Sequence, residues 1–356
     1  MFTETLSVWQ YLSEADKPVI IYGMGNGADK ILSALETRGV VPAAFMASDE
    51  FVRGHSFHGF NVRKLKDIEE EFDNFIILVA FGTNRPDVME KIYGLSEKYE
   101  LYIPDVPVYG DVLQNLFDEK YVVENFNKIK EVREVFADEQ SKEVFDRLID
   151  YKISGKTEHL RATVSDRQAA LKLLGIKSDG SEVFLDLGAY DGDTAQEFAE
   201  FTGGNYNKIY AFEPDFRNFC KLKRRHYMLE PTKLEAINAA ASDKDGSEDF
   251  SNAGGRQSAS GKGKKVKTQK VDTFCESRKI KPTFIKIDVE GSEKNALVGA
   301  AEILRRHKPK LAVSLYHRTE DLLSLPILIK KLNGRYKMYL RRHEYIPAWD
   351  INLYCI

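Results

Sequence analysis

The residue types with the clearest chemical potential lie in one glycine-rich stretch near the middle of the chain. Residues 186–194 read Asp-Leu-Gly-Ala-Tyr-Asp-Gly-Asp-Thr and stand between an apolar run and a segment with helical spacing. Glycines let the backbone approach a bound molecule closely, and the start of a helix presents free N–H groups. Glu213 and Pro214 end the next apolar run, and a carboxylate there can accept hydrogen bonds from a ribose diol. Together these features predict a nucleoside site.

The carboxylates of this stretch indicate which nucleoside it would bind. Asp186, Asp191 and Asp193 would repel the phosphates of a dinucleotide and favour a cationic ligand. An acidic residue at a strand end can hold the ammonium group of such a ligand. We therefore expect S-adenosylmethionine, a sulfonium nucleoside, as the cofactor. The alternative is a turn with a structural role alone, since glycine-rich turns are common in unrelated loops.

A second group of charged residues follows a later apolar run. Lys286, Asp288 and Glu290 alternate along the chain, so they share one side if the strand stays extended. They would lie at the carboxyl end of a parallel strand, where open α/β sheets bind ligands. Asp288 could face the transferred methyl group, the acceptor hydroxyl or a divalent cation. The alternative is a Lys–Asp ion pair that caps the following helix.

His317 follows the next strand and completes the set of candidate catalytic residues, His317, Asp288, Lys286 and Glu290. A neutral imidazole there could take the proton of an acceptor hydroxyl during methyl transfer, and a surface histidine with a hydrogen-bonding role is the alternative. Carboxylates suit a hard cation, but the sequence shows no third oxygen ligand. We therefore predict no metal site, and a divalent metal is kept only as an alternative.

Alternating apolar runs and helical segments must position these residues in the second half of the chain. Continuous apolar strands separated by helices indicate a parallel sheet covered on both faces. The last two strands can form an antiparallel terminal pair, which fits a doubly wound α/β sheet with a reversed edge. The expected strands are 182–188, 208–213, 234–240, 284–289, 310–316, 337–341 and 352–356, and the expected helices are 194–201, 218–229 and 296–306. The Gly/Ser/Lys-rich stretch Gly254–Lys267 predicts a loop between two strands.

The first half repeats this pattern on a smaller scale. Apolar strands over 19–22, 41–46 and 75–80, with a helix over 28–38, predict a small Rossmann-like unit. Apolar positions spaced among charges predict helices after residue 111. We expect three parts: a Rossmann-like domain over 1–110, a helical bridge over 111–175 and a catalytic domain over 176–356.

The first unit supports two competing functions. The turn Gly23-Met24-Gly25-Asn26-Gly27 follows a strand, and Asp49 lies near the end of the next strand, at a distance suited to a ribose contact. An oxidoreductase that uses NAD or a nucleotide sugar would place its ligand on this turn. The other alternative is a non-catalytic nucleotide-binding or scaffold protein with two Rossmann-like halves.

Five stretches of the second half resemble the FkbM-type methyltransferases, and they occur in the order typical of that family. The helical bridge and the first unit also resemble the longer members of the group. Tyr190 stands where many class I methyltransferases have glycine, a position at which the FkbM-type pattern tolerates a larger residue. The matching stretches are FLDLGAYDGDTAQEF from Phe184, IYAFEPD from Ile209, INAAASDKDG from Ile237, FIKIDVEGSEKNALVGA from Phe284 and KPKLAVSLYHRTEDL from Lys308.

The resemblance implies a class I S-adenosylmethionine fold and methyl transfer, most often to oxygen. The acceptor it implies is a sugar, a glycan precursor or a related polar metabolite, as in polysaccharide biosynthesis. Carried over to this sequence, the turn would hold the methionine part, Glu213 the ribose hydroxyls, and the segment from Asn238 the adenine. The implied cofactor-binding residues are Asp186, Gly188, Ala189, Tyr190, Asp191, Gly192, Asp193, Thr194, Glu213, Pro214, Asp215, Asn238, Ala239, Ala240 and Asp288.

Composition limits the partners and the location. The 356 residues carry a formal net charge of −3, which argues against a nucleic-acid-binding surface. No apolar run approaches the roughly 20 residues of a membrane span, and the first residues do not resemble a secretion signal. Cys220, Cys275 and Cys355 are far apart and fit a reducing compartment. We expect a cytoplasmic protein with a small-molecule or glycan acceptor, and a homodimer is compatible with the sequence.

Overall fold

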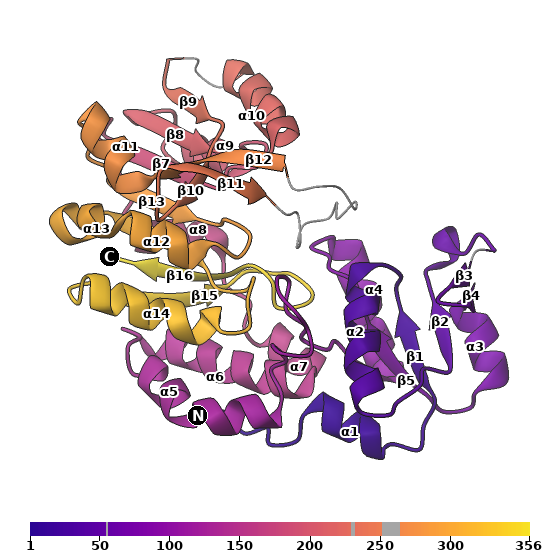
Figure 1. The fold of residues 1–356 in the computed structure, drawn as a ribbon. Helices are drawn as coiled ribbons and strands as arrows, with labels where there is room; N and C mark the ends of the chain where they lie inside the picture. The colour runs from indigo at the N-terminus through magenta and orange to yellow at the C-terminus, as the bar shows by residue number, and fades with distance from the viewer. Residues whose placement is uncertain (55, 229–231, 251–263) are drawn as a thin grey trace. The chain divides into compact units, whose positions relative to one another are not determined.

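A computed structural model describes residues 1–54, 56–228, 232–250 and 264–356 (Figure 1). The chain divides into two compact units. Unit 1 comprises residues 1–134, 138–165 and 342–351, and unit 2 comprises residues 135–137, 166–341 and 352–356. The three parts that we expect from the sequence have other borders, and those borders stay a prediction.

Unit 1 is built on a six-stranded sheet with the strand order β3-β4-β2-β1-β5-β6. Its strands are parallel except for β3, which forms an antiparallel hairpin with β4. Strands β1 and β5 are buried along their whole length, which explains their continuous apolar sequences. The strands are β1 (Val19–Tyr22), β2 (Ala44–Met46), β3 (Ser56–Phe57), β4 (Phe60–Arg63), β5 (Ile76–Val79) and β6 (Glu100–Tyr102).

The core of unit 1 joins the sheet to its first two helices. Trp9 and Leu12 of the first helix and Ile31 and Leu35 of the second pack with Ile21 of β1 in one buried cluster. The three helices between residues 119 and 161 also belong to this unit. The helices of unit 1 are α1 (Val8–Glu14), α2 (Asn26–Thr37), η1 (Asp49–Phe51), α3 (Leu65–Glu71), α4 (Pro86–Lys98), α5 (Glu119–Arg133), α6 (Glu139–Ser154) and α7 (Thr157–Arg161).

Unit 2 contains a seven-stranded sheet with the order β15-β16-β14-β13-β7-β8-β9. From β14 to β9 the strands are parallel, and β16 runs antiparallel to β14. The order reverses between β7 and β13, which makes this the topological switch point of the sheet. The strands are β7 (Val183–Leu187), β8 (Lys208–Phe212), β9 (Leu234–Ile237), β13 (Phe284–Ile287), β14 (Lys310–Ser314), β15 (Met338–Arg342) and β16 (Ile351–Cys355).

Helices cover both faces of this sheet (Figure 1). On one face, Leu174, Phe198 and Leu222, from or beside three helices, pack on Phe184 and Phe284 of the sheet. On the other face, Phe274 contacts the rings of Tyr210 and Phe212. The helices are α8 (Arg167–Leu173), α9 (Asp193–Phe201), α10 (Phe216–Met228), α11 (Val271–Arg278), α12 (Glu293–Gly299), α13 (Ala301–His307) and α14 (Asp321–Leu332).

Predicted elements that differ from the structure include the helix expected over 296–306, which divides into α12 and α13. The expected strand 234–240 ends at Ile237, and Ala240–Ser242 forms β10 of a separate three-stranded sheet with β11 (Gly246–Phe250) and β12 (Lys264–Lys270). The chain turns at Asn238, whose side-chain amide donates hydrogen bonds to the carbonyl groups of Glu213 and Pro214. Most of the expected loop Gly254–Lys267 lies outside the described residues, and its last four residues belong to β12.

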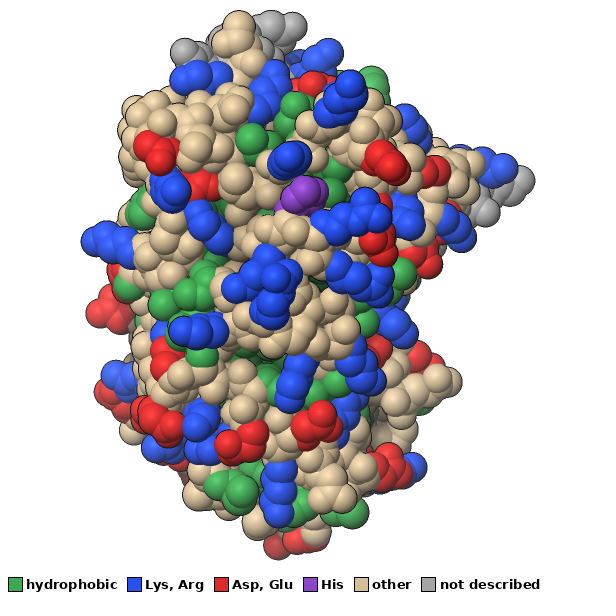
Figure 2. Space-filling view, turned by 90° about the vertical axis from the view of Figure 1, so that its left-hand side faces the viewer, with side chains coloured by type: hydrophobic (Ala, Val, Ile, Leu, Met, Phe, Trp, Pro, Cys, Tyr) green, Lys and Arg blue, Asp and Glu red, His purple; other side chains and the backbone are tan. Residues whose placement is uncertain are grey.

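The predicted fold class is confirmed: this is an α/β protein with a doubly wound, Rossmann-like sheet in its second half and a smaller parallel sheet before it. In the parts of the chain that the structure describes, no helix has the length and apolar character needed to cross a membrane. On the face drawn in Figure 2, acidic and basic side chains both occur, and exposed hydrophobic side chains form small separate groups.

Candidate functional site

The candidate site of unit 2 lies at the switch point, where β7 and β13 end side by side. Asp186 of β7 and Lys286 of β13 are partners in the register of these strands. Beyond the strands the chain segments nearly touch, because a Cβ atom at Gly188 would lie 1.8 Å from the carbonyl oxygen of Asp288. Gly188 also has a φ of 87°, a conformation that favours glycine. The glycine therefore allows the ends of β7 and β13, which carry the charged residues of the site, to lie close together.

Asp186 is the most deeply buried acid of the site. Its side chain is 0% exposed, and neither carboxylate oxygen has a hydrogen-bond partner among the described residues. The Lys286 ammonium lies 3.5 Å from Asp186 Oδ1 and 3.4 Å from Asp288 Oδ2. Burial raises the pKa of Asp186 and opposes the charge on Lys286, but the surrounding carboxylates outweigh burial and raise the pKa of Lys286. The lysine therefore stays cationic between two acids.

The glycine-rich turn then leads into α9. The amide groups of Gly188 and Ala189 donate to the carbonyl oxygen of Phe212, which holds the turn against the end of β8. Tyr190, at a φ of 48°, is half exposed. The remaining residues of the turn are used at the start of the helix: Gly192 precedes it with a φ of 91°, and Asp193 accepts a hydrogen bond from the amide of Thr194.

The structure reduces the negative charge expected of the turn. Asp191 is paired with Arg225 of α10 at 2.9 Å, so its carboxylate is already compensated by a cation. Arg225 also donates to the side chain of Gln196. Among the three aspartates from which the sequence analysis argued for a cationic ligand, Asp186 is the buried one at the strand end, while Asp191 and Asp193 have contacts within the protein. Asp186 also has the Lys286 ammonium at 3.5 Å, but its two oxygens still lack hydrogen bonds from any residue that the structure describes.

Glu213 follows β8 and is also buried. Its two oxygens accept hydrogen bonds from the backbone amides of Tyr190, at 2.9 Å, and Asp215, at 2.8 Å. Burial raises the pKa of Glu213 to about 7, and these two hydrogen bonds oppose the rise. Each carboxylate oxygen retains a lone pair for a further donor. Glu213 thus ties the turn to the end of β8 and can still receive hydroxyl groups.

The segment expected near the adenine lies next to Glu213. Asn238 is exposed and bound to the backbone of Glu213 and Pro214, whereas Ala239 is buried. Ala240 begins β10. The structure therefore brings Asp186, the turn, Glu213 to Asp215 and Asn238 to Ala240 together at the carboxyl ends of β7, β8 and β9.

The second cluster forms around His317, which follows β14. Its side chain is 1% exposed and faces three carboxylates: Nδ1 lies 2.9 Å from Glu293 Oε1, and Nε2 lies 3.4 Å from Glu290 Oε2 and 3.7 Å from Asp288 Oδ1. Glu290 has a φ of 52°, so the strand does not stay extended beyond Asp288. Glu290 reaches His317 from a turn, and the expected alternation of Lys286, Asp288 and Glu290 ends at Asp288.

The charges of this cluster determine its protonation. Burial disfavours an imidazolium ion, but the carboxylates of Glu293, Glu290 and Asp288 outweigh it and raise the pKa of His317 well above its usual value. Partial burial disfavours the charged form of Asp288, but Lys286 and His317 outweigh it and lower the pKa of Asp288. At neutral pH the cluster therefore holds a protonated His317 and an ionised Asp288. A neutral imidazole, as expected from the sequence, is not the favoured form in these surroundings.

Three residues at this site were missed in the sequence analysis. Glu293 contacts His317 and accepts hydrogen bonds from the amides of Val289 and Gly291. The hydroxyl of Tyr316 lies 3.3 Å from Asp288 Oδ1, and Arg318 donates to the carbonyl of Gly291. Glu293 stands in the first turn of a helix, a position where an exposed acid is common. Glu293 differs from an ordinary exposed acid of a first helical turn only in being buried, and the sequence does not reveal burial.

The glycine-rich turn of unit 1 is packed differently. A Cβ atom at Gly27 would lie 2.2 Å from the carbonyl oxygen of Ala80, and one at Gly23 would lie 2.8 Å from the ring of Phe81. These two glycines therefore let the chain pass close to the segment after β5. Asp49 lies in η1 and is exposed.

Comparison with known proteins finds a similarity to one family in the second half of the chain. Residues 186–347 match the model of the methyltransferase FkbM domain. No curated protein matches the chain in sequence.

Solved structures with a similar fold include a methyltransferase FkbM from Methylobacillus flagellatus KT, with a TM-score of 0.74 and 21% identity over 96% of this chain and 90% of that chain. A more distant match is an rRNA methylase from Streptococcus thermophilus, with a TM-score of 0.36 and 15% identity over 52% of this chain and 92% of that chain. Another is Aeropyrum pernix fibrillarin with bound S-adenosyl-L-methionine, with a TM-score of 0.35 and 14% identity over 53% of this chain and 73% of that chain. The first-named structure shows the fold. Residues 186–347 are therefore similar in sequence to the methyltransferase FkbM domain, and the chain shares the fold of the methyltransferase FkbM from Methylobacillus flagellatus KT.

Proposed function

We propose that the protein transfers the methyl group of S-adenosylmethionine to a hydroxyl oxygen of a sugar, a glycan precursor or a related polar metabolite. The FkbM domain accounts for methyl transfer. The observation that carries the choice of cofactor is the pair of buried carboxylates, Asp186 and Glu213, at the ends of the neighbouring strands β7 and β8. S-adenosylmethionine offers donors suited to both, an ammonium group and a ribose diol.

Asp186 supports the placement of the methionine part. A buried carboxylate whose oxygens lack hydrogen bonds is costly, and a bound ammonium group would offset that cost. Most amides of the turn already donate within the protein, so the carboxylate of the cofactor would meet the amides of Asp191 and Asp193 at the start of α9. We therefore assign the methionine part to residues 186–194.

Glu213 supports the placement of the ribose. The amides of Tyr190 and Asp215 fix its carboxylate in one orientation, so it is preorganised for two hydroxyl donors. The adenine would then lie along Asp215 and the segment from Asn238 to Ala240. This arrangement follows the rule that open α/β sheets bind ligands at the switch point, outside the carboxyl ends of their strands.

Methyl transfer is an in-line displacement in which the acceptor oxygen must be held close to the methyl carbon, so positioning contributes much of the rate. We assign the acceptor to the region of Lys286, Asp288, Glu290 and His317. Asp288 is ionised and partly exposed, so it can accept a hydrogen bond from the acceptor hydroxyl and then take its proton, as the bond from oxygen to the methyl carbon forms and the bond from sulfur to that carbon breaks. Lys286 and His317 would hold Asp288 in place as neighbouring cations.

The acceptor and the setting complete the proposal. Polar charged groups around Asp288 suit a hydroxylated small molecule or glycan better than an apolar one. The three cysteines are free thiols, and Cys275 and Cys355 are buried, which suits the reducing cytoplasm. We place the reaction there.

Isothermal titration calorimetry with S-adenosylmethionine tests the cofactor. Glu213→Ala should weaken binding about 10- to 100-fold, because a hydrogen bond to a charged group contributes about 1.5–3 kcal/mol. Glu302→Ala, which removes a half-exposed acid of α13 paired with Arg305, is the matched control and should bind like the wild type. Equal affinity of wild type and Glu213→Ala would contradict the proposal. Mass spectrometry of products from a panel of hydroxylated acceptors then identifies the methylated atom.

A further inference from the structure

We propose that Asp288, Glu293 and His317 bind a divalent transition-metal ion such as Mn²⁺. One ligand atom from each of the three residues lies within 4.8 Å of the others. Asp288 comes after β13, Glu293 begins α12, and His317 follows β14, so the fold converges three separate segments on one point. The site coincides with the region that the proposed function gives to the acceptor, and the ion would take the place of the proton on His317 and of its role as a neighbouring cation of Asp288. The inference does not depend on which methyl donor or acceptor the enzyme uses.

The spacing of the ligand atoms suits a metal ion. Divalent ions hold oxygen and nitrogen ligands at about 2.0–2.6 Å, so ligands on opposite sides of one ion lie about 4–5 Å apart. An imidazole nitrogen with two carboxylates favours a transition metal over Mg²⁺ or Ca²⁺, which prefer all-oxygen sites. Glu293 lies beside Nδ1 of His317 and Asp288 beside Nε2, so the site closes around one Mn²⁺ when a change of side-chain rotamer brings both carboxylates to the same ring nitrogen.

Buried polar atoms without hydrogen bonds support the metal site independently of the spacing of its ligand atoms. Neither ring nitrogen of His317 has a hydrogen-bond partner among the described residues, although its side chain is only 1% exposed. The Nδ1 atom is close to Glu293 Oε1 but outside hydrogen-bond geometry. Glu293 Oε2 is likewise buried and without a hydrogen bond. Buried polar atoms normally have partners, and a metal ion would supply one for both residues.

The two oxygens of Asp288 face different cations. Oδ2 lies 3.4 Å from the ammonium of Lys286, and Oδ1 lies on the side of His317, where it also accepts a hydrogen bond from Tyr316. Glu290 brings a third carboxylate to within 3.4 Å of His317, from a side chain that is 65% exposed. A divalent cation would offset this accumulation of negative charge, and the partly exposed Asp288 and Glu290 give it a route from solvent.

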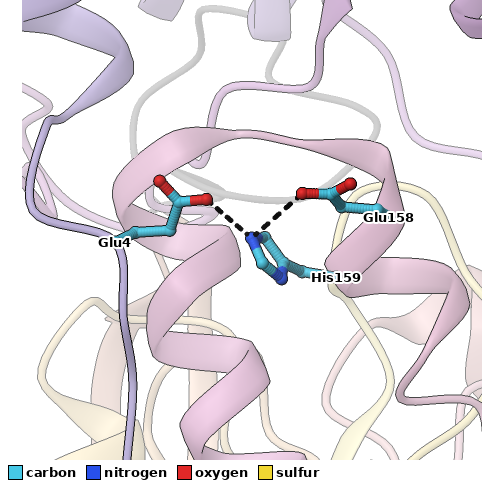
Figure 3. A group of neighbouring side chains, drawn as sticks. All are labelled: Glu4, Glu158 and His159. Atoms are coloured by element: carbon cyan, nitrogen blue, oxygen red, sulfur yellow. Dashed lines mark hydrogen bonds and ion pairs between the residues drawn. The ribbon is translucent and has the colours of Figure 1, made fainter.

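Unit 1 contains a second cluster of a histidine with two glutamates, and a comparison with it shows why the cluster around His317 is the better metal site. Glu4, Glu158 and His159 also lie near one another, with His159 Nε2 at 3.0 Å from Glu4 and 3.9 Å from Glu158 (Figure 3). There the same Glu4 oxygen is bound by the ammonium of Lys156 at 2.6 Å, which occupies the carboxylate and repels a metal ion. This cluster therefore provides a matched control.

Electron paramagnetic resonance tests the proposal, because Mn²⁺ loses its sharp six-line signal when a protein binds it. The untagged full chain, treated with EDTA and dialysed, should bind one Mn²⁺ without S-adenosylmethionine present. Asp288→Asn and Glu293→Gln should each weaken binding at least tenfold, whereas Glu158→Gln should leave it unchanged. Circular dichroism confirms that each variant is folded, and the partly exposed Asp288 provides a test if the buried Glu293 variant unfolds.

Three results would overturn the proposal: no saturable Mn²⁺ binding by the wild type up to millimolar concentration, unchanged binding in folded Asp288→Asn, or loss of binding in Glu158→Gln. In each case His317 would be a protonated side chain held by its carboxylates and no metal ligand. Because these measurements contain no methyl donor, their failure is distinct from a failure of the S-adenosylmethionine titrations.

Discussion

Burial gives Glu213 two opposing properties at the scale of a single residue. It raises the pKa of the carboxyl to about 7, above the ordinary 4.5, so the folded state favours the protonated form. The unfolded state loses this proton first as pH rises, so Glu213 costs stability progressively between about pH 4.5 and 7. The ionised form, however, is the better acceptor for a ribose diol. Stability and cofactor binding should therefore depend on pH in opposite directions at this residue.

The affinity for S-adenosylmethionine should accordingly fall as the pH is lowered from 8 to 6. With a pKa near 7, the ionised fraction of Glu213 drops about tenfold over this interval, so the dissociation constant should rise by up to about tenfold. Calorimetric titrations at several pH values measure this change. Glu213→Gln is the control, since it keeps an acceptor oxygen and cannot ionise, and any slope it retains belongs to other groups, including those of the ligand. Parallel curves for both proteins would show that Glu213 does not titrate in the complex.

At the scale of elements, the site depends on how closely two strands approach beyond their ends. Strand β7 ends at Leu187, and Gly188 turns the chain past the backbone of Asp288. The pairing of β7 with β13 places Asp186 beside Lys286. A larger residue at position 188 would have to separate the segments that carry the cofactor-binding and acceptor-binding groups.

Gly188→Ala should therefore destabilise the protein more than an alanine substitution at a glycine whose φ is positive but whose Cβ would have free space. Gly204 is the matched control, because its φ is 74° and a Cβ atom there would have no neighbour within 4 Å. Gly204→Ala should cost about 1–2 kcal/mol for the left-handed conformation. Gly188→Ala adds a clash at 1.8 Å with a carbonyl oxygen and should cost several kcal/mol in total. Urea unfolding followed by circular dichroism measures both, and similar losses would contradict the close approach.

At the scale of the whole molecule, two units with glycine-rich turns offer different surroundings to a nucleoside. In unit 2, two neighbouring strands carry buried carboxylates at their carboxyl ends: Asp186 lies near the end of β7, and Glu213 directly follows β8. In unit 1, β1 ends at Tyr22, and Gly23 and Gly27 are used to pack the chain against Ala80 and Phe81. We therefore expect the nucleoside cofactor to bind in unit 2.

Hydrogen–deuterium exchange can locate the ligand. S-adenosylhomocysteine at 100 times its dissociation constant should stabilise the bound unit by about 2.7 kcal/mol. Exchange should slow in residues 186–194 and 213–215 and stay unchanged in residues 19–27. A parallel experiment with NADH addresses the oxidoreductase alternative, for which protection of residues 23–27 would be the positive result. Protection of the unit 1 turn by S-adenosylhomocysteine would contradict the assignment.

Local sequence determined many elements of this protein correctly. The strand expected over Val19–Tyr22 has the same limits in the structure, and β8 lies within the run expected to form it. Buried strands are continuous apolar runs and helices have their own spacing, so both leave a short-range signal. Where tertiary packing intervenes, the signal fails. The single helix expected over 296–306 divides around Ala300, where a Cβ atom at Gly299 would lie 2.0 Å from the carbonyl oxygen of Ser242 in β10.

The sequence by itself predicted the seven strands of the large sheet and the acidic turn after β7, because these depend on neighbouring residues, but it did not predict α11, α14 or the sheet of β10, β11 and β12. Only the tertiary structure decided which charges meet. Asp186 and Lys286 are 100 residues apart, and the reversal of strand order between β7 and β13 makes them partners. Glu293 and His317 meet because α12 and the end of β14 converge beside Asp288. Burial then fixes their protonation, and burial is a property of the packed molecule that no local pattern specifies.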